Sequence, residues 1–476
     1  MIARLGRIAA LGALALGLTF TAAPVRAQTI ADTLILAYRH SGLMEKNRAV
    51  LRAADEDVAQ AVATLRPIIS YTLQAQRAYT SSTGQSASLD AVGQPTIDGG
   101  GSATVDSASL DITGQLLLWD GGASRLAIDA AKEAVLSTRE GLRAVEQQVL
   151  GQAVSAFLAV REAIAFVNLR ESNVALIGRE LDAARERFEV GEVTRTDVAV
   201  AEAALASARS NLAAARGDYE IAVAQYIEIT GQQPGNLAES SNLPEVANSL
   251  QAAQAVARQT HPTILRDMRL ITVAELNVLR AAAAVRPQVS AGTSLSVDEE
   301  FTESASISLQ MTGPIYRGGQ LTSQYRQAVA VRDEERADLH VTVDGILQQV
   351  AQAWAQVEVA RAQIQSGDLG VRAARIAFEG LQEEATLGAR TTLDVLAAEQ
   401  DLQDARATLI SARTAEVLAI YNLLSAMGLL TVDHLNLGVA TYDPSVYYNA
   451  VKDAPVRDVS PQGERLDSVL RAIGRN

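Results

Sequence analysis

Apolar residues recur at alternating steps of four and three residues in four long segments of the chain. Two of these series run from Val149 to Phe188 and from Ile346 to Ala385, and the other two run from Val198 to Ile229 and from Val395 to Ala426. Heptads sustained over this length predict coiled-coil helices. Many of the recurring residues are alanine, so we expect slender helices whose backbones approach one another closely.

Four shorter segments alternate with a period of two instead. They lie within residues 69–76, 110–119, 289–297 and 306–312, and in each one apolar side chains face away from hydroxyl and amide side chains. Each segment predicts a strand of about ten residues, which is the length and pattern of a strand in an outer-membrane barrel. An ordinary half-buried hairpin of a soluble protein would give the same alternation.

The chain contains one unit twice. The stretch "FEVGEVTRTDVAVAEAALASARSNLAAA" from Phe188 matches "ATLGARTTLDVLAAEQDLQDARATLISA" from Ala385, and the double-glycine segments "LLLWDGGASRLA" and "GPIYRGGQLTSQ" share that offset of 197 residues. Upstream, the Arg-Pro pair at Arg66 matches the pair at Arg286 with an offset of 220, so the first unit has 23 additional residues. We expect them in "TSSTGQSASLDAVGQPTIDGGG", whose composition is that of a loop.

The repeat divides the chain into four parts. They are a signal peptide (1–27), a first repeat (28–240) with a β-hairpin at about 68–119, a second repeat (241–442) with a β-hairpin at about 287–316, and an irregular tail (443–476) packed in part on the middle of the molecule.

Each repeat should contain one long helix matched by two shorter helices stacked end to end. The long helices are predicted at 122–188 and 319–387, roughly 100 Å each at 1.5 Å per residue. The shorter pairs are predicted at 32–66 with 193–230, and at 250–286 with 391–428. Each repeat is then a two-stranded helical rod with a β-hairpin at one end and a tight turn at the other.

The N-terminus has the pattern of a secretory signal. Arg4 and Arg7 precede an apolar stretch from Leu11 to Phe20, and Val25-Arg26-Ala27 is a cleavage site of the small-x-small type. Cleavage after Ala27 would change the formal charge from −14 to −17, and so acidic a product is a poor binder of nucleic acid. The sequence has no cysteine, which excludes disulfides and thiolate metal sites. No later apolar run is expected to span a bilayer as a helix.

The combination of motifs resembles the TolC family of outer-membrane channel proteins. The residues that carry the resemblance are "RPIIS" and "RPQVS", "LLLWDGG" and "GPIYRGG", and the turns "VGEVTRTDV" and "LGARTTLDVL", over about residues 30–440. The resemblance implies a mainly α fold with membrane β: a homotrimer with four strands per chain that shares a 12-stranded β-barrel and a long coiled-coil α-helical barrel. Strand count alone would also permit a dimer of eight strands.

The family also implies partners and a function. The helical turns of such channels dock onto a periplasmic adaptor and an inner-membrane pump, either an ABC transporter or a proton-driven pump. We therefore expect a passive exit duct in the outer membrane and periplasm, with the turns favouring type I protein secretion. Multidrug or metal efflux is an alternative, and a soluble periplasmic coiled-coil scaffold is an alternative of a different class.

In the family, acidic side chains narrow the tunnel at the second turn. Asp394 matches one of the family's two aspartate positions, whereas Ala397 occupies the other, and Asp197 lies in the equivalent place at the first turn. The resemblance implies a ring of three carboxylates that attracts cations and resists ionising together. The alternative is that Asp394 only caps the helix that follows it.

The resemblance also assigns a closed-state link to Arg390, with Thr196 and Asp197 as its partners. A tyrosine that makes a second link in the family is replaced by Ala385. An incidental surface pair is the alternative for these residues.

Two further sets complete the candidate residues. The turns should present the adaptor-binding surface, made by Gly191, Val193, Thr194, Arg195, Gly388, Thr391 and Leu393. Trp119 and Tyr316 precede the double glycines, where an interfacial aromatic belt or plain packing would place them. The histidines, His40, His261, His340 and His434, lack ligand spacing, so we expect no catalytic site, no metal site and no cofactor.

Overall fold

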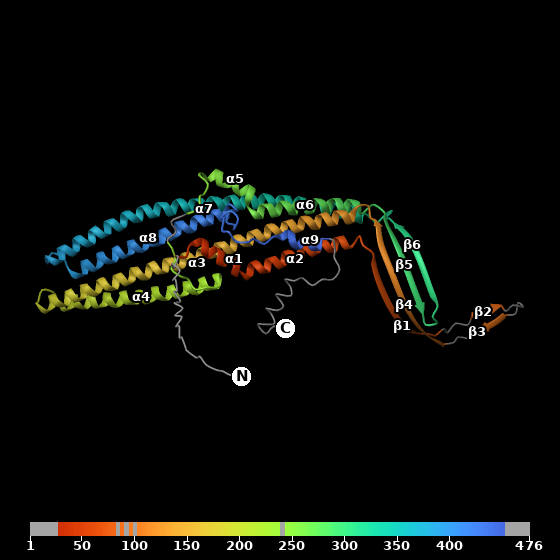
Figure 1. Cartoon of the computed structure of the whole chain (residues 1–476), viewed down its shortest axis with the longest axis horizontal. Coiled ribbons are helices and arrows are strands. Elements are labelled where there is room, and N and C mark those ends of the chain that lie inside the picture. The colour runs from red at the N-terminus through yellow and green to blue at the C-terminus, as the bar shows by residue number, and fades with distance from the viewer. Residues whose placement is uncertain (1–26, 82–85, 90–94, 99–101, 239–242, 453–476) are drawn as a thin grey trace, which may run out of the picture.

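The computed structural model of the chain describes residues 27–81, 86–89, 95–98, 102–238 and 243–452. The helices lie side by side in an elongated bundle, a β-sheet continues from one end of the bundle, and the tight helical turns lie at the other end (Figure 1). The predicted signal peptide, apart from Ala27, lies outside the described residues.

The first repeat folds largely as predicted. Its elements are α1 (Ile30–His40), α2 (Gly42–Ala63), β1 (Ile68–Ser81), β4 (Ser102–Trp119), α3 (Ala123–Glu189) and α4 (Arg195–Thr230). The second repeat has the same order: α5 (Leu250–Thr260), α6 (Pro262–Ala283), β5 (Gln288–Asp298), β6 (Glu303–Thr312), α7 (Gln320–Thr386) and α8 (Thr392–Ala426). The two long helices, α3 and α7, each have 67 residues.

The prediction of one continuous helix before each hairpin is wrong. The chain is extended at Ser41 (ψ 109°), where the serine side chain caps the next helix by accepting a hydrogen bond from the Met44 N–H at 3.3 Å. The second repeat breaks at the equivalent residue, His261 (ψ 121°), and Pro262 starts the next helix. A serine before Gly42 and a proline at the first helical position are both ordinary start signals for a helix.

The four long strands form one antiparallel sheet in the order β1-β4-β5-β6. The central pair, β4 with β5, joins the two repeats, and its register sets Thr113 opposite Ser294. Hydroxyl groups pair across the polar face, as between Ser70 and Thr113 at 2.7 Å and between Ser294 and Ser306 at 2.8 Å. The outer strands, β1 and β6, are the two edges of the sheet.

The loop prediction for the 23 additional residues is only partly correct. In the first hairpin β1 and β4 have 14 and 18 residues, well beyond the expected ten. Two further strands, β2 (Ser86–Leu89) and β3 (Pro95–Asp98), pair antiparallel beyond them. The threonines and serines of this stretch suit an extended backbone as well as a loop, and pairing with a neighbouring strand decides between the two.

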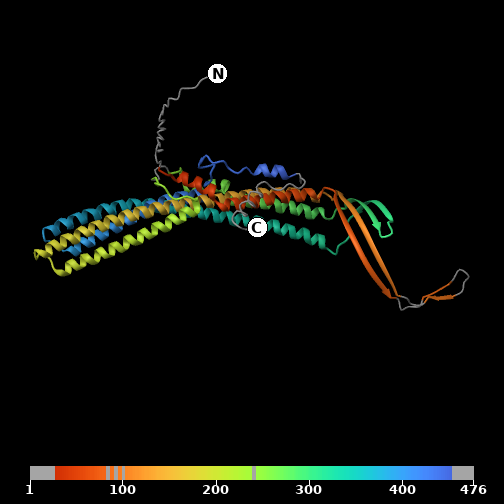
Figure 2. The ribbon, with the colours of Figure 1, turned by 60° about the horizontal axis from the view of Figure 1, so that its bottom comes forward.

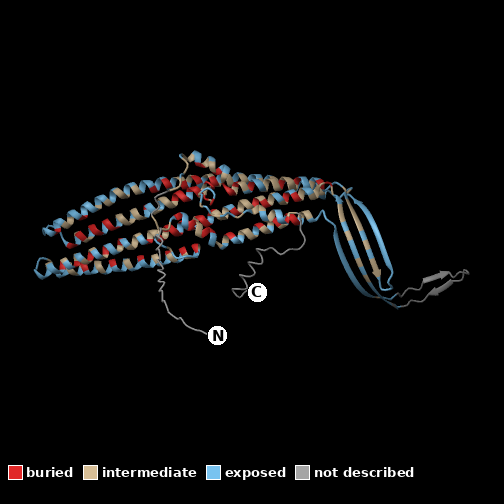
Figure 3. Ribbon diagram, in the orientation of Figure 1, coloured by how far each residue is buried: buried red, intermediate tan, exposed pale blue. Residues whose placement is uncertain are grey.

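Burial is concentrated in the middle of the bundle (Figure 3). The predicted heptad positions of α3 are buried from Val149 to Ala163 and again from Ile177 to Ala184, whereas Phe188 at the turn is exposed. The fully buried side chains of this region include Leu150, Phe157 and Tyr226. One stretch of α3 is long and apolar enough to cross a membrane by composition, contrary to our expectation, but half of it is buried among the other helices.

The C-terminal segment is more regular than predicted. Helix α9 (Pro444–Val451) lies along one side of the bundle (Figure 2). Asp443 caps it by accepting a hydrogen bond from the Ser445 N–H at 2.8 Å, and the Tyr447 hydroxyl donates to Glu56 of α2 at 2.7 Å. Helix α9 thus packs on α2, and residues 453–476 lie outside the described residues.

Candidate channel mouth and membrane sheet

Each helical turn is closed by a glycine with a left-handed backbone. Gly191 has φ +81° and Gly388 has φ +77°. After α3, the Glu192 N–H donates to the Arg187 carbonyl at 2.8 Å, and after α7 the Ala389 N–H donates to the Glu384 carbonyl at 2.9 Å. Such bonds satisfy carbonyls that a helix leaves unpaired at its C-terminus, and a side chain at the glycine would strain them.

Both turns then start a helix with the same capping box. At the second turn the Asp394 carboxylate accepts hydrogen bonds from the Thr391 N–H at 3.0 Å and the Thr391 hydroxyl at 2.9 Å, while the Asp394 N–H donates to that hydroxyl at 3.3 Å. Asp197 and Thr194 repeat the arrangement at the first turn, with carboxylate bonds of 2.9 and 2.7 Å. The predicted alternative for Asp394, a helix cap, is therefore a real contact.

The caps also fix the charge of these two carboxylates. Hydrogen bonds from the Thr391 N–H and hydroxyl hold the pKa of Asp394 below its ordinary value, with a smaller contribution from the positive charge of Arg390. The same bonds from Thr194 lower the pKa of Asp197. Within one chain both side chains are accordingly ionised at neutral pH, so a carboxylate can cap its helix and still present a negative charge at the turn.

Arg390 pairs within its own turn. Its guanidinium donates to Glu384 at 2.8 Å, and both side chains are about half exposed. This bond, with the negative charge of Glu384, raises the pKa of Arg390. No hydrogen bond or ion pair among the described residues joins Arg390 to Thr196 or Asp197 within one chain, so a link to them would have to replace the Glu384 pair.

The turns also expose apolar side chains that we did not predict as site residues. Val190 and Leu387, which precede the two glycines, are 72% and 85% exposed, and they lie beside the predicted residue Leu393, which is 59% exposed. The sequence could have indicated them, because each is an apolar residue that follows a heptad series and directly precedes a glycine. The predicted surface residues Thr194, Arg195 and Thr391 are exposed as well, while Val193 is half-buried.

A buried polar link behind the second turn was also missed. Glu399 of α8 accepts hydrogen bonds from the Asn173 side chain of α3 at 3.2 Å and from the Gln403 side chain at 2.5 Å, and all three residues are buried. It ties the helical pair of the second repeat to that of the first. Glu399 lies in a predicted coiled-coil segment, but its partner is 226 residues away, so no local pattern indicates the contact.

At the opposite end, the sheet leaves one apolar face uncovered. Tyr71 and Leu73 of β1 are 79% and 74% exposed, and Ile307 and Leu309 of β6 are 91% and 73% exposed. A continuous apolar face of this size is typical of contact with lipid or with another protein. Trp119 and Tyr316, at the junction of sheet and helices, are both exposed, so plain packing within one chain does not explain them.

Comparison with known proteins identifies the family. The chain matches the family "Outer membrane efflux protein" twice, over residues 36–232 and 237–429. It is 35% identical over 444 residues to the outer membrane efflux protein BepC of Brucella suis, covering 92% of this chain and 93% of that protein. The chain belongs to the outer membrane efflux protein family. The two matched ranges confirm the two predicted repeats.

Membership in this family confirms several predictions. The protein is an outer-membrane channel that extends into the periplasm, and it is not an enzyme. The predicted fold class, with coiled-coil helices, membrane strands and two tandem repeats, is confirmed as well. The outer-membrane location excludes the soluble periplasmic scaffold.

Solved structures of low sequence identity share the fold. CusC has a TM-score of 0.71 at 17% identity, covering 85% of this chain and 92% of that one, and the CmeC outer membrane channel of Campylobacter jejuni has a TM-score of 0.69 at 16% identity, covering 89% of each. Other relatives include the outer membrane protein TolC of Escherichia coli, 25% identical over 61% of this chain and 63% of that protein, and the alkaline protease secretion protein AprF of Pseudomonas aeruginosa, 25% identical over 65% and 67%.

Proposed function

We propose that the protein is the passive exit duct of a tripartite export system and works as a homotrimer. The observation that carries this proposal is the four-stranded sheet, which has an uncovered apolar face and two open edges. Unpaired strand edges are not tolerated in lipid, and four strands cannot close a barrel. Three copies would supply twelve strands and, through α3 and α7, helical walls of roughly 100 Å.

The helical turns would form the periplasmic mouth of this duct. In a trimer the three copies of Asp394 surround the axis, with those of Asp197 on the adjacent turns, and their ionised carboxylates make the mouth prefer cations. The surface for a periplasmic adaptor, and through it for an inner-membrane pump, comprises Gly191, Val193, Thr194, Arg195, Gly388, Thr391 and Leu393. The exposed apolar side chains of Val190 and Leu387 enlarge this surface.

The mouth would be held shut by Arg390. We propose that in the closed channel its guanidinium leaves Glu384 and binds Asp197 and Thr196 of an adjacent turn. Because exposed ion pairs are weak, exchanging the Glu384 pair for the Asp197 pair changes the free energy little. Docking of an adaptor can therefore shift Arg390 from one partner to the other.

Two cargo classes fit this duct. Type I protein secretion is favoured because the turn "GEVTRTDVAVAEAALASA" resembles the type I secretion branch of the TolC family. Relatives named for protease secretion favour the same class. Small-molecule efflux is favoured by the 35% identity to a protein named for efflux. In a strain that lacks this gene, loss of proteins from the culture medium would support the first class, and accumulation of dyes or drugs in the cells would support the second.

The duct itself is tested with the purified protein. We expect native mass spectrometry in detergent to give three copies, and planar bilayers to show discrete conductance steps that multivalent cations block from the periplasmic side. A monomer that stays soluble without detergent and conducts no ions would contradict the proposal.

A further inference from the structure

Gln28, near the start of the described chain, is held by the linker between the two repeats. Its backbone N–H donates to the Asn236 carbonyl at 2.7 Å, and its backbone carbonyl accepts a hydrogen bond from the Ala238 N–H at 2.9 Å. Its side-chain Oε1 atom accepts from the Gly235 N–H at 3.1 Å. Gln28 also forms a parallel β-bridge with Leu237, which is itself packed against the hydrophobic core. The chain is thus fixed to the linker at Gln28, before the first helix begins.

These contacts use one N–H donor and two carbonyl acceptors of Gln28, one on the backbone and one on the side chain. The side-chain Nε2 atom makes no hydrogen bond to any other described residue. A pyroglutamyl residue has the same donor and acceptors, because its chain-terminal nitrogen and its side-chain carbonyl belong to one lactam ring. Ring closure between N and Cδ therefore eliminates only the one polar group of Gln28 that the described chain does not bind.

The sequence puts the predicted cleavage site directly before this residue. The small-x-small motif ends at Ala27, so cleavage there makes Gln28 the first residue of the mature chain. The next residue, Thr29, is the N-cap of α1 and forms a capping box with Asp32. A free α-ammonium at Gln28 would place a positive charge at the positive end of that helix dipole, whereas a lactam is neutral. An ammonium would also bring three N–H groups to a site where the described contacts provide one acceptor, the Asn236 carbonyl.

We propose that cleavage after Ala27 exposes the α-amine of Gln28 and that this residue then closes into pyroglutamate, so that the mature chain begins with a neutral lactam seated on residues 235–238. A terminal α-amine is partly uncharged near neutral pH and is then a nucleophile. It attacks the side-chain Cδ atom of the same residue: the N–Cδ bond forms, the Cδ–Nε2 bond breaks, and an amine proton leaves with Nε2 as ammonia. The step consumes no oxidant, reductant or cofactor, and the two groups need no bimolecular encounter.

The lactam gives the end of the mature chain a structural role. Its N–H binds the Asn236 carbonyl, its ring carbonyl binds the Gly235 N–H, and the next carbonyl binds the Ala238 N–H, so the segment between α4 and α5 stays attached to the start of α1. A lactam also has no free amine, so aminopeptidases that need one cannot shorten the chain into the capping box of α1.

Amine labelling followed by mass spectrometry tests the modification. The mature protein, purified from outer membranes, is first treated with an amine-reactive reagent, which marks any free terminal amine, and is then digested with trypsin. We expect the terminal peptide, residues 28–39, to be unlabelled and lighter by one ammonia. The peptide of residues 259–266 is a matched control, because it begins with the same Gln-Thr pair but gains its amine only on digestion. It reports cyclisation caused by handling, and we expect it to keep its amide.

Two results overturn the modification. One is a labelled amine on Gln28, and the other is a terminal peptide that begins at a different residue, which also rules out the cleavage site. Gln28→Asn is the matched variant, because its side chain is one methylene shorter and would have to close a strained four-membered ring. Its terminal amine should therefore be labelled. Conductance of this variant should equal that of the wild type, so the modification and the proposed duct fail independently.

A second pair of variants tests where the lactam is seated. Gly235→Pro removes the N–H that binds the ring carbonyl, whereas Gly235→Ala keeps it and places a Cβ atom at an ordinary contact distance of 3.6 Å from Oε1 of Gln28. A pyroglutamyl peptidase acting on the native protein should release the terminal residue faster from Gly235→Pro than from the wild type, and Gly235→Ala should match the wild type. Equal rates in all three proteins overturn the seat on the linker.

Discussion

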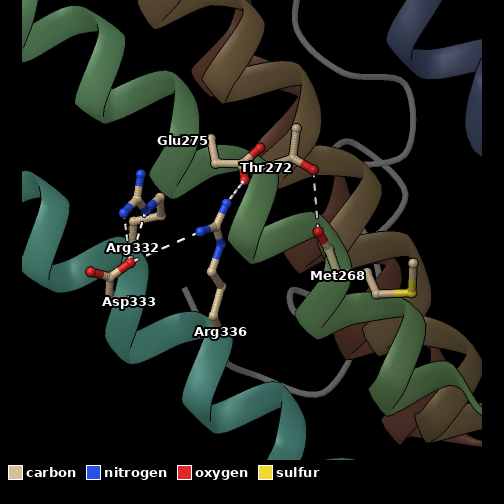
Figure 4. A network of polar contacts seen from close by, with 6 residues as sticks. All are labelled: Met268, Thr272, Glu275, Arg332, Asp333 and Arg336. Atoms are coloured by element: carbon tan, nitrogen blue, oxygen red, sulfur yellow. Dashed lines mark hydrogen bonds and ion pairs between the residues drawn. The ribbon is translucent and has the colours of Figure 1, made fainter.

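The two repeats place an arginine and a carboxylate at equivalent positions in different surroundings. In the second repeat, Arg336 of α7 binds Glu275 of α6 at 2.6 Å, and both side chains are about half exposed. Figure 4 shows the Arg336 guanidinium between Glu275 and Asp333. The equivalent residues of the first repeat are Arg139 and Asp55, and there the carboxylate is completely buried.

The difference comes from the C-terminal segment. Helix α9 packs on α2, and the Tyr448 ring lies over the guanidinium of Arg139 at 5.4 Å. Burial raises the pKa of Asp55 to about 6, although the positive charge of Arg139 opposes the shift. Internal symmetry therefore determines where charged residues lie, whereas the segment that covers one repeat determines how they ionise.

The largest expected effect is a pH dependence that comes from Asp55 in the first repeat and has no counterpart at Glu275. Because the folded-state pKa of Asp55 is above its unfolded value of 3.8, its contribution to the free energy of unfolding is fully present below about pH 4 and is lost as the pH rises through about 6. A shift of this size corresponds to about 3 kcal/mol. Asp55→Asn should reduce the pH dependence of the free energy of unfolding by this amount, as measured by chemical denaturation in detergent between pH 4 and 7.5, while the raised pKa values of Glu146 and Glu335 leave a remainder.

The matched control for that experiment is Glu275→Gln in the second repeat. Its ion pair is half exposed, so we expect a change of less than about 1 kcal/mol. Equal pH dependence in the wild type and in Asp55→Asn would show that burial does not shift the ionisation of Asp55.

A second comparison separates the capping role of Asp394 from its charge. Glutamine at this position of a capping box still caps the helix, so Asp394→Gln removes the charge and Asp394→Ala removes both. If the ring of carboxylates attracts cations, both variants should weaken block by a trivalent cation by about tenfold or more. Single-channel recording measures this block.

The same substitution in the first repeat serves as the control. Asp197→Gln also keeps its cap, and we expect a smaller effect because the family resemblance places the narrowest point at the second turn. The charge hypothesis fails if Asp394→Gln conducts and is blocked like the wild type while only Asp394→Ala differs. The hydrogen bonds from Thr391 lower the pKa of Asp394 and so oppose the rise that repulsion among three carboxylates would cause.

A smaller effect on the free energy of unfolding is expected at one core position that is polar in the first repeat and apolar in the second. Tyr226 of α4 is fully buried and shares a hydrogen bond of 3.0 Å with the buried Thr33 hydroxyl, whereas the equivalent residue of α8 is Leu423, also fully buried. Tyr226→Phe should lower the free energy of unfolding by about 1 kcal/mol, because the Thr33 hydroxyl loses one of its two hydrogen bonds and keeps only the longer one to the Thr29 carbonyl at 3.3 Å. The further substitution Thr33→Ala should lower the free energy of unfolding little more, because the position then contains only apolar side chains, as it does in the second repeat.

The sequence predicted the repeated architecture well because its signals are local and redundant. The double glycines and the repeated turns bounded two long helices close to the observed 67 residues of α3 and α7, and the alternating segments identified the four strands of the larger sheet. The break at Ser41 was missed because heptad periodicity is insensitive to one extended residue between helices in line. Helix α9 was missed because eight residues are too few to show a period, although Asp443 before Pro444 is a start signal.

For the candidate mouth, the sequence predicted which residues are present but not which partners they contact. The sequence identified Asp394 as a cap or a charge, and the structure supports the cap directly. It did not indicate that Arg390 would pair with Glu384, because the two residues flank a turn and follow no helical spacing. The buried link of Glu399 with Asn173 depends on how the two repeats pack together, which is a tertiary property.

The smallest expected effect concerns the turn in which the repeats differ most. The second turn has Arg390, and the equivalent residue of the first turn is Val193. Because Glu384 holds the guanidinium in its own turn, Glu384→Ala should free Arg390 for Asp197 and lower the resting conductance. Arg390→Ala should raise it, and the double variant should match Arg390→Ala. Changes of the same sign in the two single variants would mean that the turn loses its structure, and that Arg390 is an incidental surface residue rather than the residue that holds the mouth shut.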